Sequence, residues 1–352
     1  MKMKNALKNC LYLYFSFSIF ILLLIRNSYQ RENSSLRKLN SYSSIDITIK
    51  SNGNQSILYQ GFTPKPSNIT INGEMKKIES DMRYNLTENY NYISIIWYDN
   101  LKNFAKMFYD CSNIFTINIS NSEDTLITNM SQMFEGCNSL ESIDFNYINT
   151  SYLKDMNNMF SRCYSLKSLN LSFFETSNVT YMKYMFYNCR NLTFLDLSNF
   201  NTSNVDNMEN IFNNCTNLYS LDLSSFNTQR VTNMQYMFYN CNKLESLDLS
   251  NFNASKINNM YCMFCHCRKL ESLNLSNFYT SKVKNMQSMF YNCMNLKSVE
   301  LTNFITSNIT NMANMFYNCI NLTYLDLSHF DTSNVTTMQN MFYHCYNLSS
   351  LD

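Results

Sequence analysis

The sequence predicts an α/β repeat solenoid that stacks one short strand and one short helix per 26-residue rung, preceded by a small N-terminal β cap. A unit such as Leu192–Asn217 recurs without insertion or deletion from about Leu140 to the C-terminus. A Met-Phe pair marks the register of almost every unit, and a cysteine follows each pair at a fixed distance. These cysteines, which we call the cysteine ladder, are Cys111, Cys137, Cys163, Cys189, Cys215, Cys241, Cys267, Cys293, Cys319 and Cys345.

Residues 1–30 are predicted to be a targeting segment. Lys2, Lys4 and Lys8 precede an apolar run from Cys10 to Ile25. The run is shorter than the roughly 20 residues that a spanning helix needs, and no small-residue cleavage site follows it. A cleaved signal peptide and a retained transmembrane signal anchor are therefore both open. Both place the rest of the chain at the cell surface or in the secreted fraction.

Between this segment and the repeats, two further regions are expected. Residues 31–44 are polar and without periodicity, which indicates a flexible stalk. Residues 45–100 contain alternating runs such as Ile45–Ile49 and Tyr92–Ile95, with Pro64 and Pro66 between them as turns. We expect a β-rich cap over 45–100 that covers the first hydrophobic face of a solenoid over 101–352, which holds about ten repeats.

Each repeat unit has a strand half and a predicted helical half. Leu195 and Leu197 alternate with polar residues, which is typical of a strand with one buried face. The polar segment Asn201–Asn204 supplies a turn. In the neighbouring unit, the apolar residues of Val179–Cys189 are spaced i, i+3, i+6, i+7 and i+10. This spacing is typical of the one-sided stripe of a short amphipathic helix.

Composition and charge exclude one class of partner. Gly and Pro number only 4 and 2, so Asn, Ser and Thr must form the bends. The net charge is +1, but residues 1–40 carry seven basic side chains and one acidic side chain, which leaves the remainder at −5. A basic nucleic-acid footprint is therefore missing from the repeats, and we expect no nucleic-acid partner.

The repeat carries a family resemblance. Leu244–Cys267 and Leu322–Cys345 follow the pattern LxSLDLSxFxTSxVxxMxxMFYxC with few departures, and this pattern resembles the BspA-like leucine-rich repeat surface proteins. The similarity covers about Leu101–Asp352. It implies a secreted or surface-anchored repeat protein used for adhesion or binding, but ligands differ within the family and do not transfer.

The cysteine ladder has two interpretations. Equivalent positions of adjacent rungs would lie about 5 Å apart, which is within the Cα range of a disulfide. Alternatively, the thiols stay free and buried as small hydrophobic groups. We favour free thiols, because a chain that is 45% hydrophobic has an ample core without cross-links.

Cys262, Cys265 and His266 form a C-x-x-C-H motif of the haem-attachment type. Each replaces a Tyr or Asn of the other units, and the intervening Phe264 is a core residue, which argues against haem. The three side chains remain a weak zinc candidate. We otherwise predict no metal and no cofactor.

The candidate ligand-binding residues are acidic side chains on the outward, concave face of the predicted strands. This acidic strip comprises Asp144, Asp196, Asp222, Asp248, Glu300 and Asp326. Acids stacked this closely repel one another, and solvent or a bound cation or basic ligand would relieve that repulsion. The strip is therefore either a recognition surface or a solvated face that prevents sheet association. A second candidate contact region is the tyrosine series Tyr187, Tyr239, Tyr291, Tyr317 and Tyr343.

No catalytic constellation departs from the repeat, and no Gly-rich phosphate loop is present in the sequence. We therefore predict a non-enzymatic surface protein that mediates adhesion or protein binding. Its partner would be a protein or glycan on a host, the matrix or a neighbouring cell, with membrane contact through the N-terminal segment. The alternatives are a self-associating surface coat and an ectodomain fragment of a longer receptor. Asn-x-Ser/Thr triplets such as that at Asn54 predict glycosylation, although an Asn-rich repeat also generates them by chance.

Overall fold

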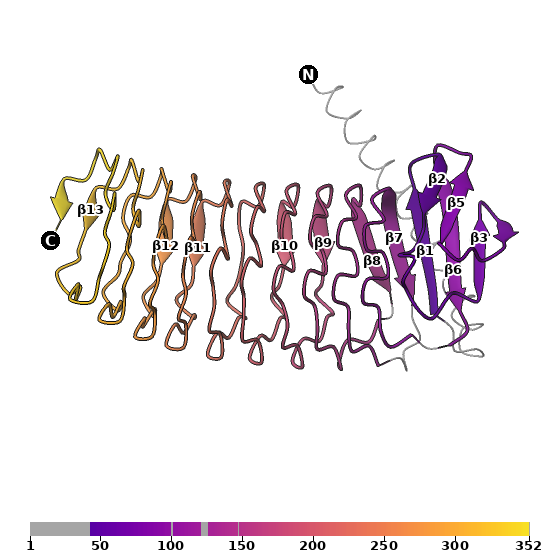
Figure 1. Ribbon diagram of the computed structural model, residues 1–352, viewed down its shortest axis with the longest axis horizontal. Helices are drawn as coiled ribbons and strands as arrows, with labels where there is room; N and C mark the ends of the chain where they lie inside the picture. The colour runs from indigo at the N-terminus through magenta and orange to yellow at the C-terminus, as the bar shows by residue number, and fades with distance from the viewer. Residues whose placement is uncertain (1–42, 100, 121–125, 147, 352) are drawn as a thin grey trace, which may run out of the picture.

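The computed structural model describes residues 43–99, 101–120, 126–146 and 148–351. These residues form a long coil, with a cluster of strands at the N-terminal end and a stack of similar rungs that continues to the other end (Figure 1). The predicted targeting segment and residues 31–42 of the predicted stalk lie outside the described residues. Within the described ranges, no helix is long and apolar enough to cross a membrane.

The N-terminal strands are continuous with the first strands of the repeats. The main sheet has the order β4-β3-β6-β1-β7-β8, in which β7 and β8 pair in parallel and the other pairs are antiparallel. The first strands of the repeats therefore extend the same sheet. Its strands are β1 (Ser43–Ile49), β3 (Asn68–Ile71), β4 (Glu74–Lys76), β6 (Asn91–Trp97), β7 (Ile114–Ser120) and β8 (Ser142–Asn146), and β2 (Gly53–Ser56) pairs separately with β5 (Arg83–Leu86).

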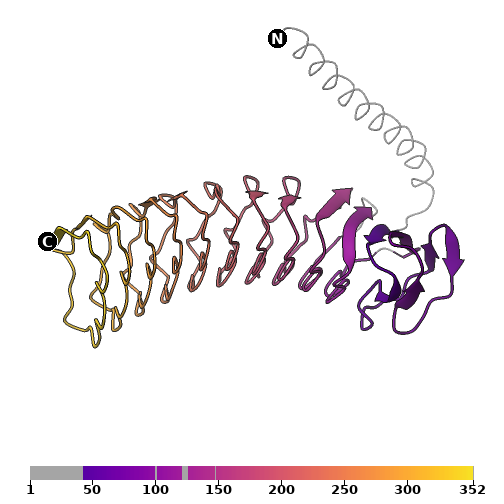
Figure 2. The same cartoon turned by 90° about the horizontal axis from the view of Figure 1, so that it is seen from above.

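The later rungs carry short strands along one side of the coil (Figure 2). They pair in parallel with a register of one repeat, for example Leu195 with Leu169. We number the 26 positions of a rung from its first leucine, so that Leu192 is position 1. The strands are β9 (Ser168–Asn170), β10 (Phe194–Asp196), β11 (Ser246–Asp248), β12 (Ser272–Asn274), β13 (Tyr324–Leu325) and β14 (Ser350–Leu351).

The core is a set of continuous apolar columns. The phenylalanines at position 21, from Phe108 to Phe342, stack ring on ring with centroids 5.2–5.8 Å apart. Leucines from the strand half and methionines from the other half surround this stack and are almost all buried. Because each rung buries its side chains against its neighbours, stability is shared along the array.

The prediction of one helix per rung is wrong, because the described residues form no helix. The N–H groups of Tyr184, Phe186 and Asn188 donate to carbonyls of the next rung at 2.7–3.1 Å. Between them, the N–H of Tyr187 closes a tight turn onto the carbonyl of Tyr184 at 3.1 Å, and the N–H of Cys189 then closes another onto the carbonyl of Phe186 at 3.1 Å. A helix would bond every N–H four residues back along its own segment. The fold is therefore a β-solenoid, although a repeat solenoid was correctly predicted.

Backbone dihedral angles explain why a helix cannot form here. Positions 19 and 23 have positive φ in each described rung from Phe104 onward, and two such residues per turn exclude a right-handed helix. Position 23 is often Asn, which tolerates this conformation better than most residues. Its φ is 58–61° at Asn188, Asn214, Asn240, Asn292 and Asn318. The apolar stripe is still satisfied, because residues three apart in these turns also face the same side.

Buried threonines join the rungs at the turn after each strand. Thr202 is fully buried, and its Oγ1 donates to the carbonyl of Asn227 at 2.9 Å and accepts from the N–H of the same residue at 2.8 Å. Thr176 and Thr228 make the same pair of bonds to the rungs that follow them. Ala254 occupies this position in one rung, and its side chain has no hydroxyl that could make these bonds.

Candidate binding surface

The acidic strip lies on the strand face, at position 5 of its rungs. Asp222, Asp248, Glu300 and Asp326 are exposed, and Asp144 and Asp196 are half-buried. Asn170 and Asn274 occupy the same position in two further rungs. The strip is therefore a row of exposed and half-buried carboxylates interrupted by amides.

The aspartates of this strip also have a structural role. Oδ1 of Asp196, Asp222 and Asp326 accepts from the backbone N–H two residues later at 2.9–3.0 Å. Oδ1 of Asn170 and Asn274 accepts the same bond at 3.1 Å. Each side chain thus stabilises the turn that ends its strand, in the manner of an Asx turn. Because Asn makes the same bond, the negative charge is not required for the turn.

These hydrogen bonds also hold the carboxylates in their charged form. The backbone N–H and then the hydroxyl of the following serine lower the pKa of Asp196 and Asp222. At Asp326, the Ser328 hydroxyl and then its N–H have the same effect on the pKa. Hydrogen bonds to the charged form favour that form, so these three carboxylates of the strip stay anionic at neutral pH.

A shallow hollow of about 540 Å³ lies on the strand face. Ser246, Asp248, Ser272 and Glu300 are among the side chains that line it. Position 3 is a small serine in four successive rungs, from Ser220 to Ser298. The same position carries a large ring before and after this run, in Phe194 and Tyr324, which are 52% and 47% exposed. We call this serine-floored surface between the two rings the trough.

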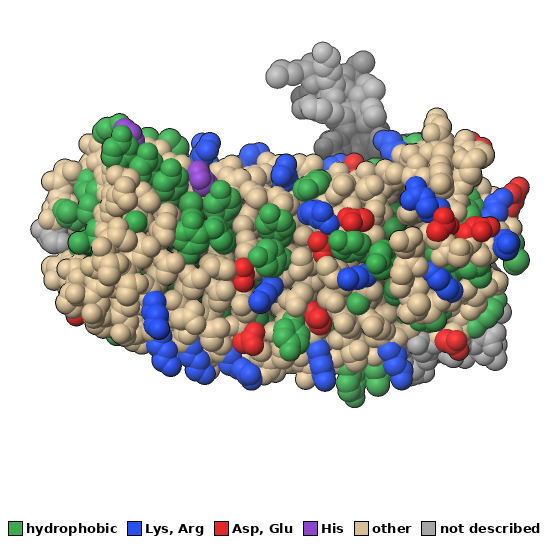
Figure 3. Space-filling view, in the orientation of Figure 1, with side chains coloured by type: hydrophobic (Ala, Val, Ile, Leu, Met, Phe, Trp, Pro, Cys, Tyr) green, Lys and Arg blue, Asp and Glu red, His purple; other side chains and the backbone are tan. Residues whose placement is uncertain are grey.

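A different face carries aromatic side chains, which we call the aromatic column. The rings of Tyr291 and Tyr317 stack with centroids 4.6 Å apart, and those of Tyr317 and Tyr343 stack at 5.1 Å. His266 makes edge contacts with Tyr239 at 5.5 Å and Tyr291 at 5.3 Å. Figure 3 shows hydrophobic and histidine side chains gathered on the C-terminal half of the array, and basic side chains in a row along its lower edge.

The histidine and the two cysteines of the C-x-x-C-H motif lie in different surroundings. Nδ1 of His266 lies 3.1 Å from Nδ2 of Asn292, and burial lowers the pKa of its imidazole. Cys262 and Cys265 lie together on one turn and are almost fully buried. In the part of the chain that the structure describes, no group of three or more His, Cys, Asp or Glu side chains could hold a metal ion.

The described cysteines are all free thiols. From Cys137 to Cys345, each ladder cysteine donates from Sγ to the carbonyl of a phenylalanine in the preceding rung at 3.0–3.2 Å. Burial raises the pKa of these thiols, at Cys267 to about 12. The ladder cysteines are thus core residues that also satisfy a buried carbonyl.

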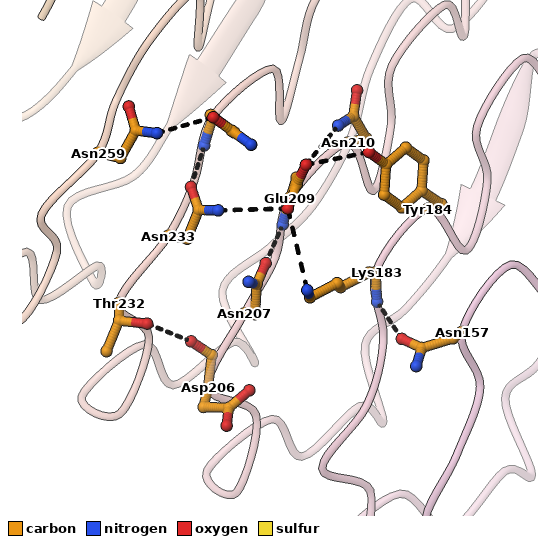
Figure 4. Close-up of polar contacts among 11 residues, drawn as sticks. Asn157, Lys183, Tyr184, Asp206, Asn207, Glu209, Asn210, Thr232, Asn233 and Asn259 are labelled. Atoms are coloured by element: carbon orange, nitrogen blue, oxygen red, sulfur yellow. Dashed lines mark hydrogen bonds and ion pairs between the residues drawn. The ribbon is translucent and has the colours of Figure 1, made fainter. Parts of the chain in front are cut away.

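One polar cluster was not predicted from the sequence. Tyr184 Oη donates to Glu209 Oε1 at 3.0 Å, Asn233 Nδ2 donates to Glu209 Oε2 at 3.3 Å, and Lys183 Nζ lies 4.0 Å from the same oxygen (Figure 4). Burial and then Glu209 raise the pKa of Tyr184 to about 12. Both carboxylate oxygens are bonded within the chain, and these contacts join three rungs. The available sequence signal was an acid at position 18, where the preceding rung carries Lys183 and the following rung carries Gln235.

Two family models match the chain. The model described as "Mycoplasma protein of unknown function, DUF285" matches residues 102–219, 191–299 and 266–351. The model described as "BspA type Leucine rich repeat region" matches residues 38–156. No relative among the curated proteins matches the sequence.

A solved structure also shows a distant similarity. The match is to the "Crystal structure of TLR13-ssRNA13 complex", at 19% identity and a TM-score of 0.26. It covers 71% of this chain and 41% of that chain. A TM-score this low does not establish a common fold.

Proposed function

Since the chain belongs to the DUF285 family and carries BspA-type leucine-rich repeats, we propose that it is a non-enzymatic cell-surface protein that binds another protein through its strand face. The observation that carries this proposal is the trough with its acidic strip. The partner would present a basic surface and would belong to a host, the extracellular matrix or a neighbouring cell.

The trough suits such a partner for two reasons. Asp248 and Glu300 line the hollow, and Asp222 lies one rung before Asp248, so a row of negative charge faces an approaching protein. Complementary charge mainly raises the association rate and the specificity. Phe194 and Tyr324 expose large rings at its two ends, and exposed aromatic rings are common anchors in protein interfaces.

Surface exposure is tested by labelling intact cells with a membrane-impermeant biotin reagent and measuring the mass of the labelled chain. Labelled protein that begins near Met1 supports a retained anchor. Labelled protein that begins beyond about Ser28 supports a cleaved signal. Protein that is present but unlabelled would contradict the surface role.

Binding is tested with beads that carry the full chain, added to cultured cells and to matrix proteins. The test variant is Asp196→Asn, Asp222→Asn and Asp248→Asn, because Asn preserves the turn bond seen at Asn170 and Asn274. We expect binding to fall at least about tenfold, with unchanged thermal stability. The matched control is Glu175→Gln, Asp206→Asn and Asp331→Asn, which removes the same charge from exposed turns outside the strip.

Equal loss of binding in the two variants would show that net charge matters and the trough does not. Concentration-dependent self-association of the chain, measured by sedimentation without any partner, would instead support the surface-coat alternative.

A further inference from the structure

Cys262 and Cys265 occupy positions 19 and 22 of their rung. In other rungs, the side chains at these two positions contact each other. Gln132 Nε2 donates to Glu135 Oε2 at 2.8 Å across the same two positions. The rings of Tyr236 and Tyr239 lie 5.6 Å apart there. The backbone path therefore places the two cysteine side chains side by side.

The turn that holds this pair is closed. The N–H of Cys265 donates to the carbonyl of Cys262 at 3.2 Å, and the φ of Cys262 is 52°. Residues at the two ends of such a four-residue turn have Cα atoms less than about 7 Å apart. Disulfides span Cα distances of about 4.4–6.8 Å. A disulfide between these residues is thus compatible with the existing turn.

The two thiols also contact each other, unlike those of the cysteine ladder. A hydrogen bond joins the Cys262 and Cys265 side chains, and it lowers the pKa of Cys262 and raises that of Cys265. Burial opposes this lowering at Cys262, and hydrogen bonds from Tyr261 and Ser288 add to it, so that the net shift of the Cys262 pKa is downward. Ladder thiols instead donate to backbone carbonyls, and burial raises their pKa. Because the thiolate is the reactive form, Cys262 is the better nucleophile.

We propose that Cys262 and Cys265 form a redox-active dithiol, which a small neutral peroxide oxidises to an intramolecular disulfide. A small oxidant is required, because the two residues are only 5% and 3% exposed. This inference does not depend on the proposed binding function.

The reaction has two steps. Cys262 first releases its proton to solvent, and the resulting thiolate attacks one peroxide oxygen. The O–O bond breaks, and the departing hydroxide takes up a proton from solvent and leaves as water. This leaves Cys262 as a sulfenic acid. Cys265 sulfur then attacks the Cys262 sulfur, the S–O bond breaks, and the hydroxide leaves with the Cys265 proton as a second water. The two sulfurs lose two electrons in total, and hydrogen peroxide is reduced to two waters.

The test exposes the folded full chain to hydrogen peroxide, removes the oxidant, denatures the protein, alkylates it with iodoacetamide and digests it with trypsin. The tryptic peptide Ile257–Arg268 contains Cys262, Cys265 and Cys267. We expect this peptide to carry one alkyl group, on Cys267, and to have lost two hydrogens. Reduction before alkylation should restore three alkyl groups.

The same digest contains an internal control. The peptide Val231–Lys243 contains the ladder residue Cys241, which should remain fully alkylated. The variant Cys262→Ser should form no disulfide in the 257–268 peptide. Its far-ultraviolet circular dichroism spectrum should match that of the unmodified chain. If the two spectra differ, Cys265→Ser replaces Cys262→Ser as the test variant.

Three alkyl groups on the 257–268 peptide after peroxide treatment would overturn the proposal. A disulfide that includes Cys267, or cross-links within the cysteine ladder, would overturn it as well.

Discussion

Two adjacent rungs share the phenylalanine and cysteine columns of the core but differ outside these columns, at three positions in particular. In the regular rung, Leu218–Lys243, the tight turn carries Tyr236 and Tyr239. In the divergent rung, Leu244–Lys269, two cysteines replace them, and Ala254 replaces the joining threonine.

The cores of these two rungs still align. The rings of Phe238 and Phe264 stack with centroids 5.5 Å apart, and Cys267 donates to the carbonyl of Phe238 at 3.1 Å. The comparison teaches that the stacked phenylalanines, the ladder cysteines and the backbone hydrogen bonds between rungs are enough to keep the shape of the rung. Positions outside these columns, even buried ones, can therefore carry other side chains.

The largest expected effect comes from the phenylalanine stack. Phe238→Ala and Phe264→Ala should each lower the free energy of unfolding by about 3–5 kcal/mol, because each removes a fully buried ring. Urea denaturation of the full chain measures this loss. The conservative Phe264→Leu should cost less. A divergent rung that tolerates Phe264→Ala while Phe238→Ala unfolds the array would contradict the equivalence of the two cores.

A smaller effect is expected at the joining threonine. Thr228→Ala should lower the free energy of unfolding by about 1–3 kcal/mol, because it leaves the N–H and carbonyl of the half-buried Asn253 without the hydroxyl. Ala254→Thr should raise it by about 1 kcal/mol by supplying the missing hydroxyl. Thr228→Ser, which keeps the hydroxyl, is the control. Destabilisation by Ala254→Thr in thermal melts would show that the divergent rung has adapted to alanine.

Replacing a cysteine should have a different effect on stability in each of the two rungs. Cys241→Ala should cost about 1–2 kcal/mol, since it opens space in the core and removes the bond to the carbonyl of Phe212. Cys262→Ala should cost less than about 1 kcal/mol, because its thiol lies outside the inner columns. Thermal melts under reducing conditions measure both. Equal costs would mean that Cys262 has a packing role like that of the ladder.

The smallest effect concerns pH and the acidic strip. The lowered pKa of Asp222 contributes stability that is fully present above the unfolded-state value of about 3.9. This contribution is lost as the pH falls through the lower folded-state pKa. Asp222→Asn should therefore weaken the acid dependence of the urea midpoint, and Asn274→Asp should strengthen it. Identical midpoints from pH 6 to pH 2.5 for all three chains would contradict this linkage.

The sequence located the strand face but missed how its side chains are held. Alternation around Leu195 and Leu197 placed Asp196 on the outside, where the structure also has it. The bond from the N–H of Ser198 to Asp196 was missed, although an Asp or Asn two residues before a serine is a signal for an Asx turn. The trough was missed because the serines of its floor and the rings at its two ends come from different rungs.

The helix prediction failed at a position that the sequence does mark. Asn188 directly precedes Cys189, and Asn recurs there because position 23 needs a positive φ. The spacing of Met182, Met185 and Phe186 is compatible both with a helix and with a succession of tight turns. Periodicity alone does not separate these two backbones.

The sequence by itself determined the length of the rung, its register and which side chains enter the core. These properties depend on the local order of apolar and polar residues, which repeats every 26 residues. Only the tertiary structure decided the backbone path between the methionines and the cysteine. There, the N–H of Phe186 finds its acceptor at Ile211 in the next rung, at 3.0 Å. Because stacking supplies a hydrogen-bond partner for alternate N–H groups, the segment does not need the internal bonds of a helix.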